Sequence, residues 1–316
     1  MVRQILWRLV NLVPLLFVIS LLVFFISQAG PADPIKDVLS QKMSAEQIEQ
    51  IRQAYGLDQS AWSQYLHWLR DMFTGGGGIS LSVRSPVSGI VYPAFLNTLI
   101  LGAATVVLTV VLGVLIGFVS GIRHGRPVDR AAMLFVQIGS NLPIYWFGLI
   151  IIWLTAVWRN WLPAGGMHDL RGDGGFGDLL LHLIAPAFAA SLVSMLIVAR
   201  FVRAAVIESA QSDYIRTYRS QGFGRAAILG KHIGRNILPS IVNTTGLTIG
   251  SVITGVVFVE TIFSWPGIGS VLLNAIAGSD YPVIQSGILL VAVTFVLVNL
   301  ITDVLYKFVD PRVVLK

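Results

Sequence analysis

The sequence contains no cysteine and few charged residues. The absence of cysteine among the 316 residues excludes disulfides, thiolate metal sites and a cysteine nucleophile within this chain. Charged residues make up only 12% of the chain, whereas hydrophobic residues make up 55%. A soluble domain of this length and composition would aggregate, so the composition indicates a polytopic membrane protein.

Motifs that carry chemistry are also missing. The nearest approach to a nucleotide-binding loop runs from Gly224 to His232. It has five residues between its glycines where a P-loop has four, and His232 stands where Ser or Thr must hold magnesium. No His-Glu-x-x-His or Gly-x-Ser-x-Gly motif occurs, and the five histidines are scattered along the chain. We therefore expect no catalytic residue, no metal site and no cofactor in this chain.

Long uncharged stretches take the place of such motifs. A helix needs about 20 apolar residues to cross the hydrocarbon core of a bilayer. Six stretches meet this length, at about 9–28, 95–121, 133–157, 179–199, 237–259 and 283–302. The sequence therefore predicts an all-α integral membrane protein with six transmembrane helices and both termini on one side.

Basic residues flank these stretches unevenly. The N-terminus, the 122–130 and 200–236 loops and the C-terminal tail hold 15 of the 22 Lys and Arg residues. Because basic loops stay on the cytoplasmic side, both termini are expected in the cytoplasm. The net charge of +6 then reflects the topology of a multi-pass membrane protein, surrounded by lipid and without a nucleic-acid partner.

No predicted span carries an ionisable residue at its centre. His182, Glu260 and Asp303 lie near the ends of their spans. A proton- or sodium-coupled carrier usually needs such a residue near mid-membrane. The pattern disfavours secondary transport and favours a conduit that is powered from outside the chain.

Residues 29–94 form a long extracytoplasmic segment, so that a first region, 1–94, precedes a five-helix core, 95–316. A capping box at 44–47 opens a helix that ends near Gly56, and Asp58 is a candidate cap for a second helix. One face of that second helix is apolar and aromatic and carries Trp62, Tyr65, Leu66, Leu69, Met72 and Phe73. This face is expected to lie against the bilayer interface or the body of the protein, where it either packs a small cap or contacts a partner protein. Gly75 to Gly78 are expected to form a flexible hinge.

Small residues recur at four-residue spacing within the predicted spans. Gly113, Gly117 and Gly121 share one face of the second span, which lets helix backbones approach closely in lipid. The fifth span has a small, polar face made of Asn243, Gly246, Gly250 and Thr254. This second face either lines a translocation path or packs against a neighbouring helix.

The 200–236 loop is the most informative segment. Asp213 can cap a helix, residues 214–221 fill two turns, and Gly222 can end the helix. Tyr214, Ile215 and Tyr218 fall on one side, where they can enter a groove of a partner protein and pass on a rigid-body movement. The candidate coupling residues are Asp213, Tyr214, Ile215, Arg216, Thr217, Tyr218, Arg219, Ser220, Gln221 and Gly222.

Residues 215–222, Ile-Arg-Thr-Tyr-Arg-Ser-Gln-Gly, resemble the coupling-loop signature of the dipeptide, oligopeptide and nickel branch of ABC importer permeases. Further matches are Glu-Thr-Ile-Phe-Ser-Trp-Pro-Gly-Ile-Gly at 260–269, Asp-Tyr-Pro at 280–282, the 299–303 region, Asp-Pro-Arg at 310–312, Gly-Leu-Asp at 56–58 and Gln-Tyr-Leu-His-Trp at 64–68. Together they cover nearly the whole chain. Tyr218 departs from the branch, in which a small residue is usual at this position.

The resemblance implies a type I importer permease fold like that of the methionine importer, in a multi-pass protein of the bacterial cytoplasmic (inner) membrane. It implies three kinds of partner: a second related permease, two ATPase subunits that bind ATP and magnesium, and an extracytoplasmic solute-binding protein. Alternating access is the implied mechanism, and di- or oligopeptides are the leading cargo. The alternatives are a nickel or other metal chelate, an opine or another conjugate, and, from a different class, a membrane receptor or structural subunit without a transport role.

The turn after the fifth span allows two interpretations. Pro266, Gly267 and Gly269 stop the helix and, with Trp265, form a turn at the outer surface. The turn either needs no further function or acts as a gate or as a docking surface for the binding protein.

Overall fold

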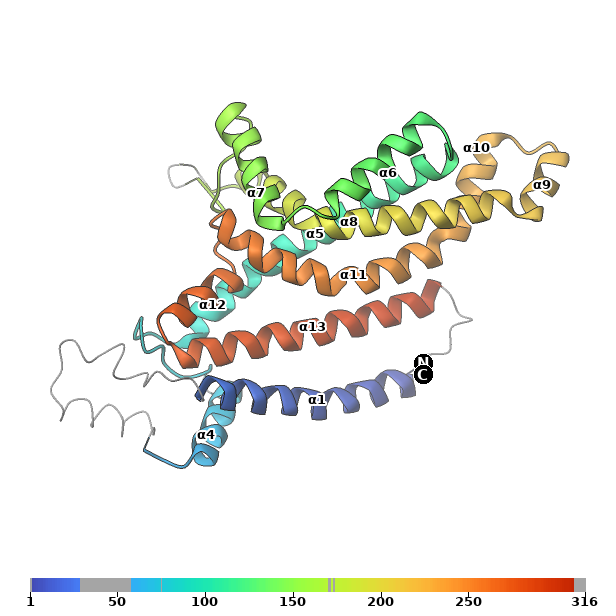
Figure 1. Ribbon diagram of the computed structural model, residues 1–316. Coiled ribbons are helices and arrows are strands. Elements are labelled where there is room, and N and C mark those ends of the chain that lie inside the picture. The colour runs from blue at the N-terminus through green and yellow to red at the C-terminus, as the bar shows by residue number, and fades with distance from the viewer. Residues whose placement is uncertain (1, 29–57, 75, 170–171, 173, 310–316) are drawn as a thin grey trace. The chain divides into compact units, whose positions relative to one another are not determined.

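The structure, a computed structural model, describes residues 2–28, 58–74, 76–169, 172 and 174–309. Every regular element among these residues is a helix (Figure 1), apart from an isolated β-bridge between Ile79 and Pro86. The chain forms two compact units: unit 1 comprises Met1–Thr98 and Pro266–Leu297, and unit 2 comprises Leu99–Trp265 and Val298–Lys316. The predicted all-α fold is confirmed. The division of the sequence into 1–94 and 95–316 stays a prediction.

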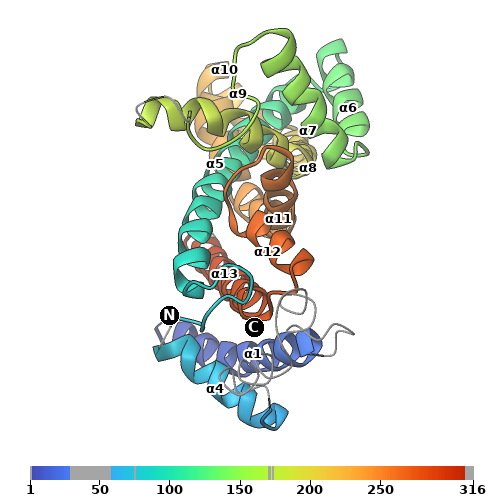
Figure 2. The same ribbon diagram turned by 90° about the vertical axis from the view of Figure 1, so that its left-hand side faces the viewer.

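Unit 1 is organised around an aromatic contact between two helices. It holds α1 (Val2–Gln28), α4 (Ala61–Thr74), the start of α5 (Val87–Ile122), α12 (Ile268–Ala277) and most of α13 (Tyr281–Val309). Helix α4 lies against α1 (Figures 1 and 2), because Tyr65 and Trp68 are buried against Phe24. Tyr65, Leu69 and Met72 of the predicted aromatic face pack in this contact. Trp68 belongs to the buried side, and three residues of the predicted face are exposed, namely Trp62, Leu66 and Phe73.

The start of α4 differs from the prediction. The helix begins at Ala61, and the N–H of Ser63 donates to Ser60 Oγ at 3.4 Å. The expected cap at Asp58 is therefore wrong, because Ser60 is the residue that precedes the first turn. The helix expected at 44–56 lies outside the described residues.

Three glycines shape the turn between α4 and α5. Gly76, Gly77 and Gly78 have φ values of 77°, 88° and 87°, which residues with a side chain rarely adopt. The N–H of Gly77 donates to the carbonyl of Asp71 at 3.1 Å, and a Cβ at Gly77 would lie 2.6 Å from Ser286 Oγ. The expected flexible hinge is therefore a turn with a defined conformation.

The carboxylate of Asp280 fixes the loop that follows this turn. Asp280 is buried and accepts hydrogen bonds from the hydroxyl groups of Ser80 and Ser82. It also accepts the backbone N–H groups of Leu81 at 3.2 Å and Ser82 at 3.1 Å. Hydrogen bonds to an ionised group are stronger than neutral ones, so the Asp-Tyr-Pro sequence at 280–282 has a structural role within unit 1.

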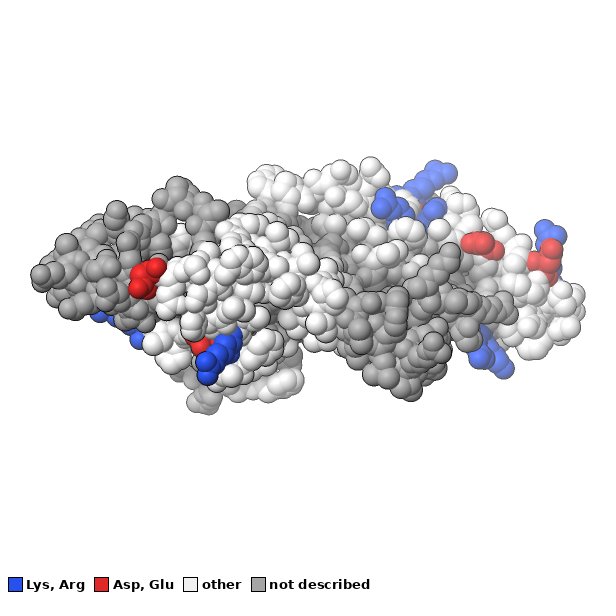
Figure 3. Space-filling view, turned by 90° about the horizontal axis from the view of Figure 1, so that it is seen from below, with Lys and Arg blue, Asp and Glu red and all other residues white. Residues whose placement is uncertain are grey.

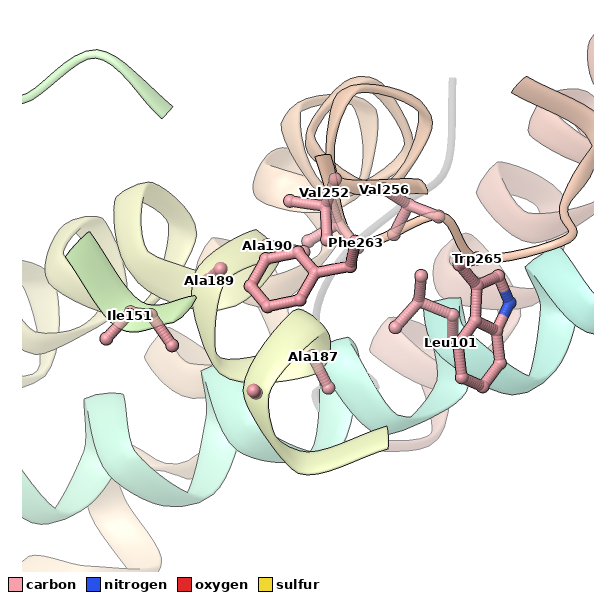
Figure 4. Close-up of a cluster of buried hydrophobic side chains, with 11 residues drawn as sticks. Leu101, Ile151, Ala187, Ala189, Ala190, Val252, Val256, Phe263 and Trp265 are labelled. Atoms are coloured by element: carbon pink, nitrogen blue, oxygen red, sulfur yellow. The ribbon is translucent and has the colours of Figure 1, made fainter. Parts of the chain in front are cut away.

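Unit 2 is built around two long helices. Its elements after α5 are α6 (Pro127–Gly139), α7 (Ile144–Ile152), the π-helical η1 (Trp153–Trp158), α8 (Phe176–Gln211), α9 (Asp213–Ser220), α10 (Arg225–Ala227), the π-helical η2 (Ile228–Ile233) and α11 (Gly234–Ile262). Helices α8 and α11 lie along each other (Figure 1). Ala187, Ala189 and Ala190 of α8 share a buried cluster with Val252 and Val256 of α11 (Figure 4). Small side chains on α8 thus let the two helices approach closely.

The glycines of α5 form the contact that their spacing predicts. A Cβ at Gly117 would lie 2.5 Å from the carbonyl oxygen of Ala199 and 2.8 Å from Val202 Cβ, both on α8. Added Cβ atoms at Gly113 and Gly121 would also come within 3 Å of α8 atoms. Helix α5 can therefore approach α8 this closely only at glycine, and the predicted packing seam is confirmed inside unit 2.

We expect Gly117→Ala to destabilise the protein, since the added methyl group would overlap the α8 backbone. Overpacking of this kind costs about 1–3 kcal/mol. The matched control is Gly102→Ala on the same helix, because an added Cβ there would have no neighbour within 4 Å in the described chain. The free energy of unfolding of the purified chain in SDS is measured for both variants. Equal stability of Gly117→Ala and the wild type would contradict the seam.

The third predicted span is not one continuous helix. Its two parts, Pro127–Gly139 and Ile144–Trp158, are bent by 110°. Pro143 disfavours a helical conformation in the residue before it, and Asn141 Nδ2 donates to the carbonyl of Gln137 at 2.7 Å. The expectation of a single helix over 133–157 is therefore wrong.

Fewer continuous spans than expected occur in the described part of the chain. Three helices are long and apolar enough to cross a membrane, namely Val87–Ile122, Phe176–Gln211 and Tyr281–Thr302. Up to five spans result if each bent pair counts as one, the second pair being Arg225–Gly250 and Val252–Ile262 at 51°. A shorter apolar helix, Leu12–Ser27, lies where the first span is expected. The count of six spans and the cytoplasmic termini stay predictions.

Candidate coupling site and translocation face

The helix predicted in the 200–236 loop is α9. It follows α8 after a single residue, Ser212, which occupies the N-cap position. The expected cap at Asp213 is wrong, because Asp213 is already the first helical residue. Gly222 has a φ of 81° and donates its N–H to the carbonyl of Arg219 at 3.1 Å. The predicted end of the helix at this glycine is confirmed.

The apolar side of α9 faces the chain itself. Ile215 is only 1% exposed and packs with Val206 of α8 and Ile233 of η2. Tyr218 is packed against the same cluster. The expectation that this side enters a groove of a partner is therefore wrong for Ile215, because its surface is buried inside unit 2. It stays a prediction for Tyr214 and for the partly exposed Tyr218.

An aromatic cluster joins α9 to the segment that leads into α11. The rings of Tyr218 and His232 are stacked, with centroids 3.8 Å apart and planes inclined by 27°. Phe223 meets both rings edge-on, with its centroid 5.3 Å from that of Tyr218 and 5.6 Å from that of His232. The local spacing of residues gives no sign of this contact, so the sequence did not reveal His232 and Phe223 as part of the site.

Tyr214 adds a polar contact between the same elements. Its hydroxyl oxygen lies 2.5 Å from Ser209 Oγ of α8 and accepts a hydrogen bond from Asn236 Nδ2 of α11 at 2.9 Å. Helix α9 is therefore attached to both long helices of unit 2.

The outward side of α9 is polar and basic. Arg216, Thr217, Arg219 and Ser220 are exposed. Asp213 Oδ1 lies 3.7 Å from Arg216 Nη1, but both side chains are largely exposed, so this contact contributes little. Figure 3 shows blue side chains at the end of unit 2 that carries α9 and α10. This side of α9 is available to a second protein.

A bidentate ion pair joins the first turn of α6 to α8. Arg203 donates through Nε and Nη2 to the two oxygens of Asp129, at 2.6 and 2.9 Å. Asp129 also accepts the N–H of Gly125 at 2.9 Å, and His124 Nδ1 lies 3.3 Å from Asp129 Oδ2. The side chain of Asp129 is 4% exposed and that of Arg203 is 22% exposed. Within the described ranges, no group of three or more His, Asp or Glu side chains is arranged to hold a metal ion.

One face of α11 is open along much of the helix. Its exposed or partly exposed members recur every three or four residues, and they are Asn243, Leu247, Gly250, Thr254, Phe258 and Thr261. Three of the four residues that were predicted to form the small, polar face of the fifth span lie on this open face, namely Asn243, Gly250 and Thr254. The fourth, Gly246, lies against Thr302, whose Cγ2 would be 2.4 Å from an added Cβ. The sequence did not reveal Leu247 or Phe258, because apolar residues in a membrane helix look alike whatever they face.

The turn after α11 is anchored by aromatic side chains. Phe263 and Trp265 are buried in the largest cluster of unit 2 (Figure 4). The N–H of Trp265 donates to the carbonyl of Glu260 at 2.8 Å. These contacts give the turn a structural role, and its role as a gate or docking surface stays a prediction.

Comparison with known proteins assigns a family to this architecture. The sequence profile described as "binding-protein-dependent transport system inner membrane component" matches residues 113–315, and the profile of the N-terminal part of such components matches residues 1–94. The chain belongs to this family. It is therefore a multi-pass inner membrane component of a binding-protein-dependent transport system, and the resemblance carried by its motifs is confirmed.

Relatives of this transport component are similar over the whole chain. The dipeptide transport system permease protein of Escherichia coli strain K12 is 34% identical over 335 residues, which cover 99% of each chain. The oligopeptide transport system permease protein of Bacillus subtilis strain 168 is 36% identical over 314 residues, again 99% of each chain. A chain of the MetNI methionine ABC transporter in an inward-facing conformation has a TM-score of 0.59 at 17% identity, covering 71% of this chain and 98% of that chain. The predicted methionine-importer-like fold is confirmed.

Proposed function

We propose that this transport component is the permease subunit of an ATP-driven importer that moves di- or oligopeptides across the inner membrane. The similarity over 99% of the chain to permease proteins of a dipeptide and an oligopeptide transport system carries the proposal. Those relatives do not favour a metal chelate, an opine or a receptor without a transport role. ATP hydrolysis falls to separate subunits, so this chain is not an enzyme and binds neither ATP nor magnesium.

The proposed assembly pairs this chain with a second, related permease. Each ATPase subunit binds ATP and magnesium on the cytoplasmic side, where both termini of this chain lie, and an extracytoplasmic binding protein delivers the peptide. The six spans predicted from the sequence then enclose half of a pathway that opens to one side of the membrane at a time.

The outward side of α9 is the proposed contact with an ATPase subunit. Its main charged groups, Arg216 and Arg219, are both cationic and exposed. Complementary charge steers association and fixes the register of an interface. The groove that receives α9 should therefore carry carboxylate side chains.

The open face of α11 is the proposed lining of the pathway. Asn243 and Thr254 offer hydrogen-bonding groups, whereas Leu247 and Phe258 offer apolar contacts. A peptide presents amide groups and apolar side chains together, so this mixture suits it. The exposed amide of Asn243 also favours a water-filled path over lipid, in which polar groups need partners. The Thr254 hydroxyl already donates to the carbonyl of Gly250 at 3.1 Å.

We expect the double variant Arg216→Glu, Arg219→Glu to lose ATPase subunits from the purified complex. Like charges set against one another at an interface are strongly unfavourable, so binding should weaken at least about tenfold. The matched control is Arg70→Glu, an exposed arginine of α4 in the predicted extracytoplasmic segment. Size-exclusion chromatography of both complexes measures retention of the ATPase subunits. Full retention in the double variant would contradict docking through this side of α9.

Native mass spectrometry of the tagged chain, purified mildly from its own membranes with the binding protein retained, tests the whole assignment. We expect masses that correspond to a second permease and two ATPase subunits, and a peptide released from the binding protein. Release of a metal chelate or an opine would contradict the assigned peptide cargo but would still support an ATP-driven importer. Reproducible recovery of the folded chain alone would support the non-transport alternative instead.

A further inference from the structure

The contacts on the inner side of α9 lead to one particular helix. His232, which stacks on Tyr218, lies in η2, and η2 continues into α11 at Gly234. Asn236, which donates to the Tyr214 hydroxyl, lies in the first turn of α11. Helix α9 is thus held by the same helix that carries the open face proposed as the pathway lining.

The packing beneath these contacts is tight. Ile215 is 1% exposed and shares a buried cluster with residues of α8, η2 and α11, which are Val198, Val202, Val206, Ile228, Ile233 and Ile237. Close-packed clusters transmit a displacement because they leave little free volume in which to deform. A shift of α9 must therefore carry the start of α11 with it or break these contacts.

His232 contributes through the face of its ring. Its Nε2 atom is buried and has no hydrogen-bond partner among the described residues. The ring is also set in a π-helical turn, a kind of distortion that is rare and frequent at functional sites. The imidazole is therefore placed for stacking on Tyr218, the residue at which the chain departs from its branch.

We propose that the Tyr218–His232 stack, supported by the Tyr214–Asn236 hydrogen bond, passes the movement of α9 to α11 and sets how much peptide is moved for each ATP hydrolysed. These four residues are positioning residues, since the role inferred for them is to hold α9 against η2 and α11. The inference rests on the proposed function and adds to it the route by which the ATPase subunits act on the pathway.

The test compares two rates in the same proteoliposomes, with the complete complex of permeases and ATPase subunits. We expect His232→Ala to lower the ratio of peptide uptake to ATP hydrolysis about two- to tenfold, the range that corresponds to the loss of one aromatic pair. His232→Phe keeps a ring for stacking and is expected to restore the ratio. A residue with only a structural role would change the amount of assembled complex and leave this ratio unchanged.

A second variant, Asn236→Ala, keeps the test decisive if His232→Ala assembles poorly. Asn236→Ala is expected to lower the ratio as well, and Tyr218→Ala combined with His232→Ala should lower it no further than either change alone. A ratio equal to that of the wild type in His232→Ala or Asn236→Ala would overturn the inference. A wild-type complex without ATP-driven peptide uptake would instead overturn the proposed function, so the two failures are distinguishable.

Discussion

Gly222→Pro is expected to abolish peptide uptake while the chain still inserts into the membrane. Proline holds φ near −65° and has no N–H, whereas Gly222 has a φ of 81° and donates its N–H to Arg219. The change therefore removes the end of α9 and redirects residues 223–227, which lie between α9 and η2. Uptake of labelled dipeptide by cells and the amount of chain in their membranes are measured side by side.

Two further variants define the cause of that loss. Gly222→Asn should retain most of the uptake, because asparagine tolerates a positive φ better than other residues with a side chain. Tyr218→Glu should abolish uptake as proline does, since it places a carboxylate against His232 and Phe223. Normal uptake in Gly222→Pro and Tyr218→Glu would refute the role of α9 in coupling.

Arg203→Met is expected to cause the largest loss of stability of any single change proposed for this chain. It leaves the carboxylate of Asp129, whose side chain is 4% exposed, without its bidentate partner. Breaking a buried ion pair costs about 3–5 kcal/mol, and the 22% exposure of Arg203 places the expected value at the lower end. The free energy of unfolding in SDS measures the effect.

The double variant Asp129→Asn, Arg203→Met separates charge from packing. It should recover most of the lost stability, because the neutral amide can still accept the N–H of Gly125 and no unpaired charge remains buried. Arg200→Met is the matched control, since Arg200 is exposed on the same helix and surface changes are usually within about 0.5 kcal/mol. A double variant as unstable as Arg203→Met would show that the arginine stabilises the protein through packing and not through its charge.

Local patterns in the sequence predicted the features that depend on local geometry. The Gly113, Gly117 and Gly121 spacing predicts a close helix contact because every fourth residue falls on one face, and the structure has that contact with α8. The end of α9 at Gly222 follows from the same kind of rule, since a positive φ favours glycine. The length of the apolar stretches likewise predicted where the long helices α5 and α8 lie in the sequence.

Features that join distant segments could not be predicted in this way. Asp129 and Arg203 are far apart in the sequence, and no spacing rule pairs them. The burial of Ile215 could not be predicted for a similar reason, because an apolar residue on α9 suits a partner's groove as well as it suits a contact with α8 and η2. The break in the third predicted span could not be predicted from hydropathy. Hydropathy shows that a stretch is long and apolar, but it does not show the local effect of Pro143 and Asn141 on the helix.

The most direct test of the central claim is uptake of labelled dipeptide into proteoliposomes that contain the complex purified through a tag on this chain. With the binding protein and peptide present, we predict that peptide accumulates only when ATP and magnesium are supplied on the ATPase side. Accumulation of peptide without ATP would contradict the assignment of this chain as the permease of an ATP-driven peptide importer. The assignment would also be contradicted if a complete complex hydrolysed ATP but accumulated none of the peptides tried.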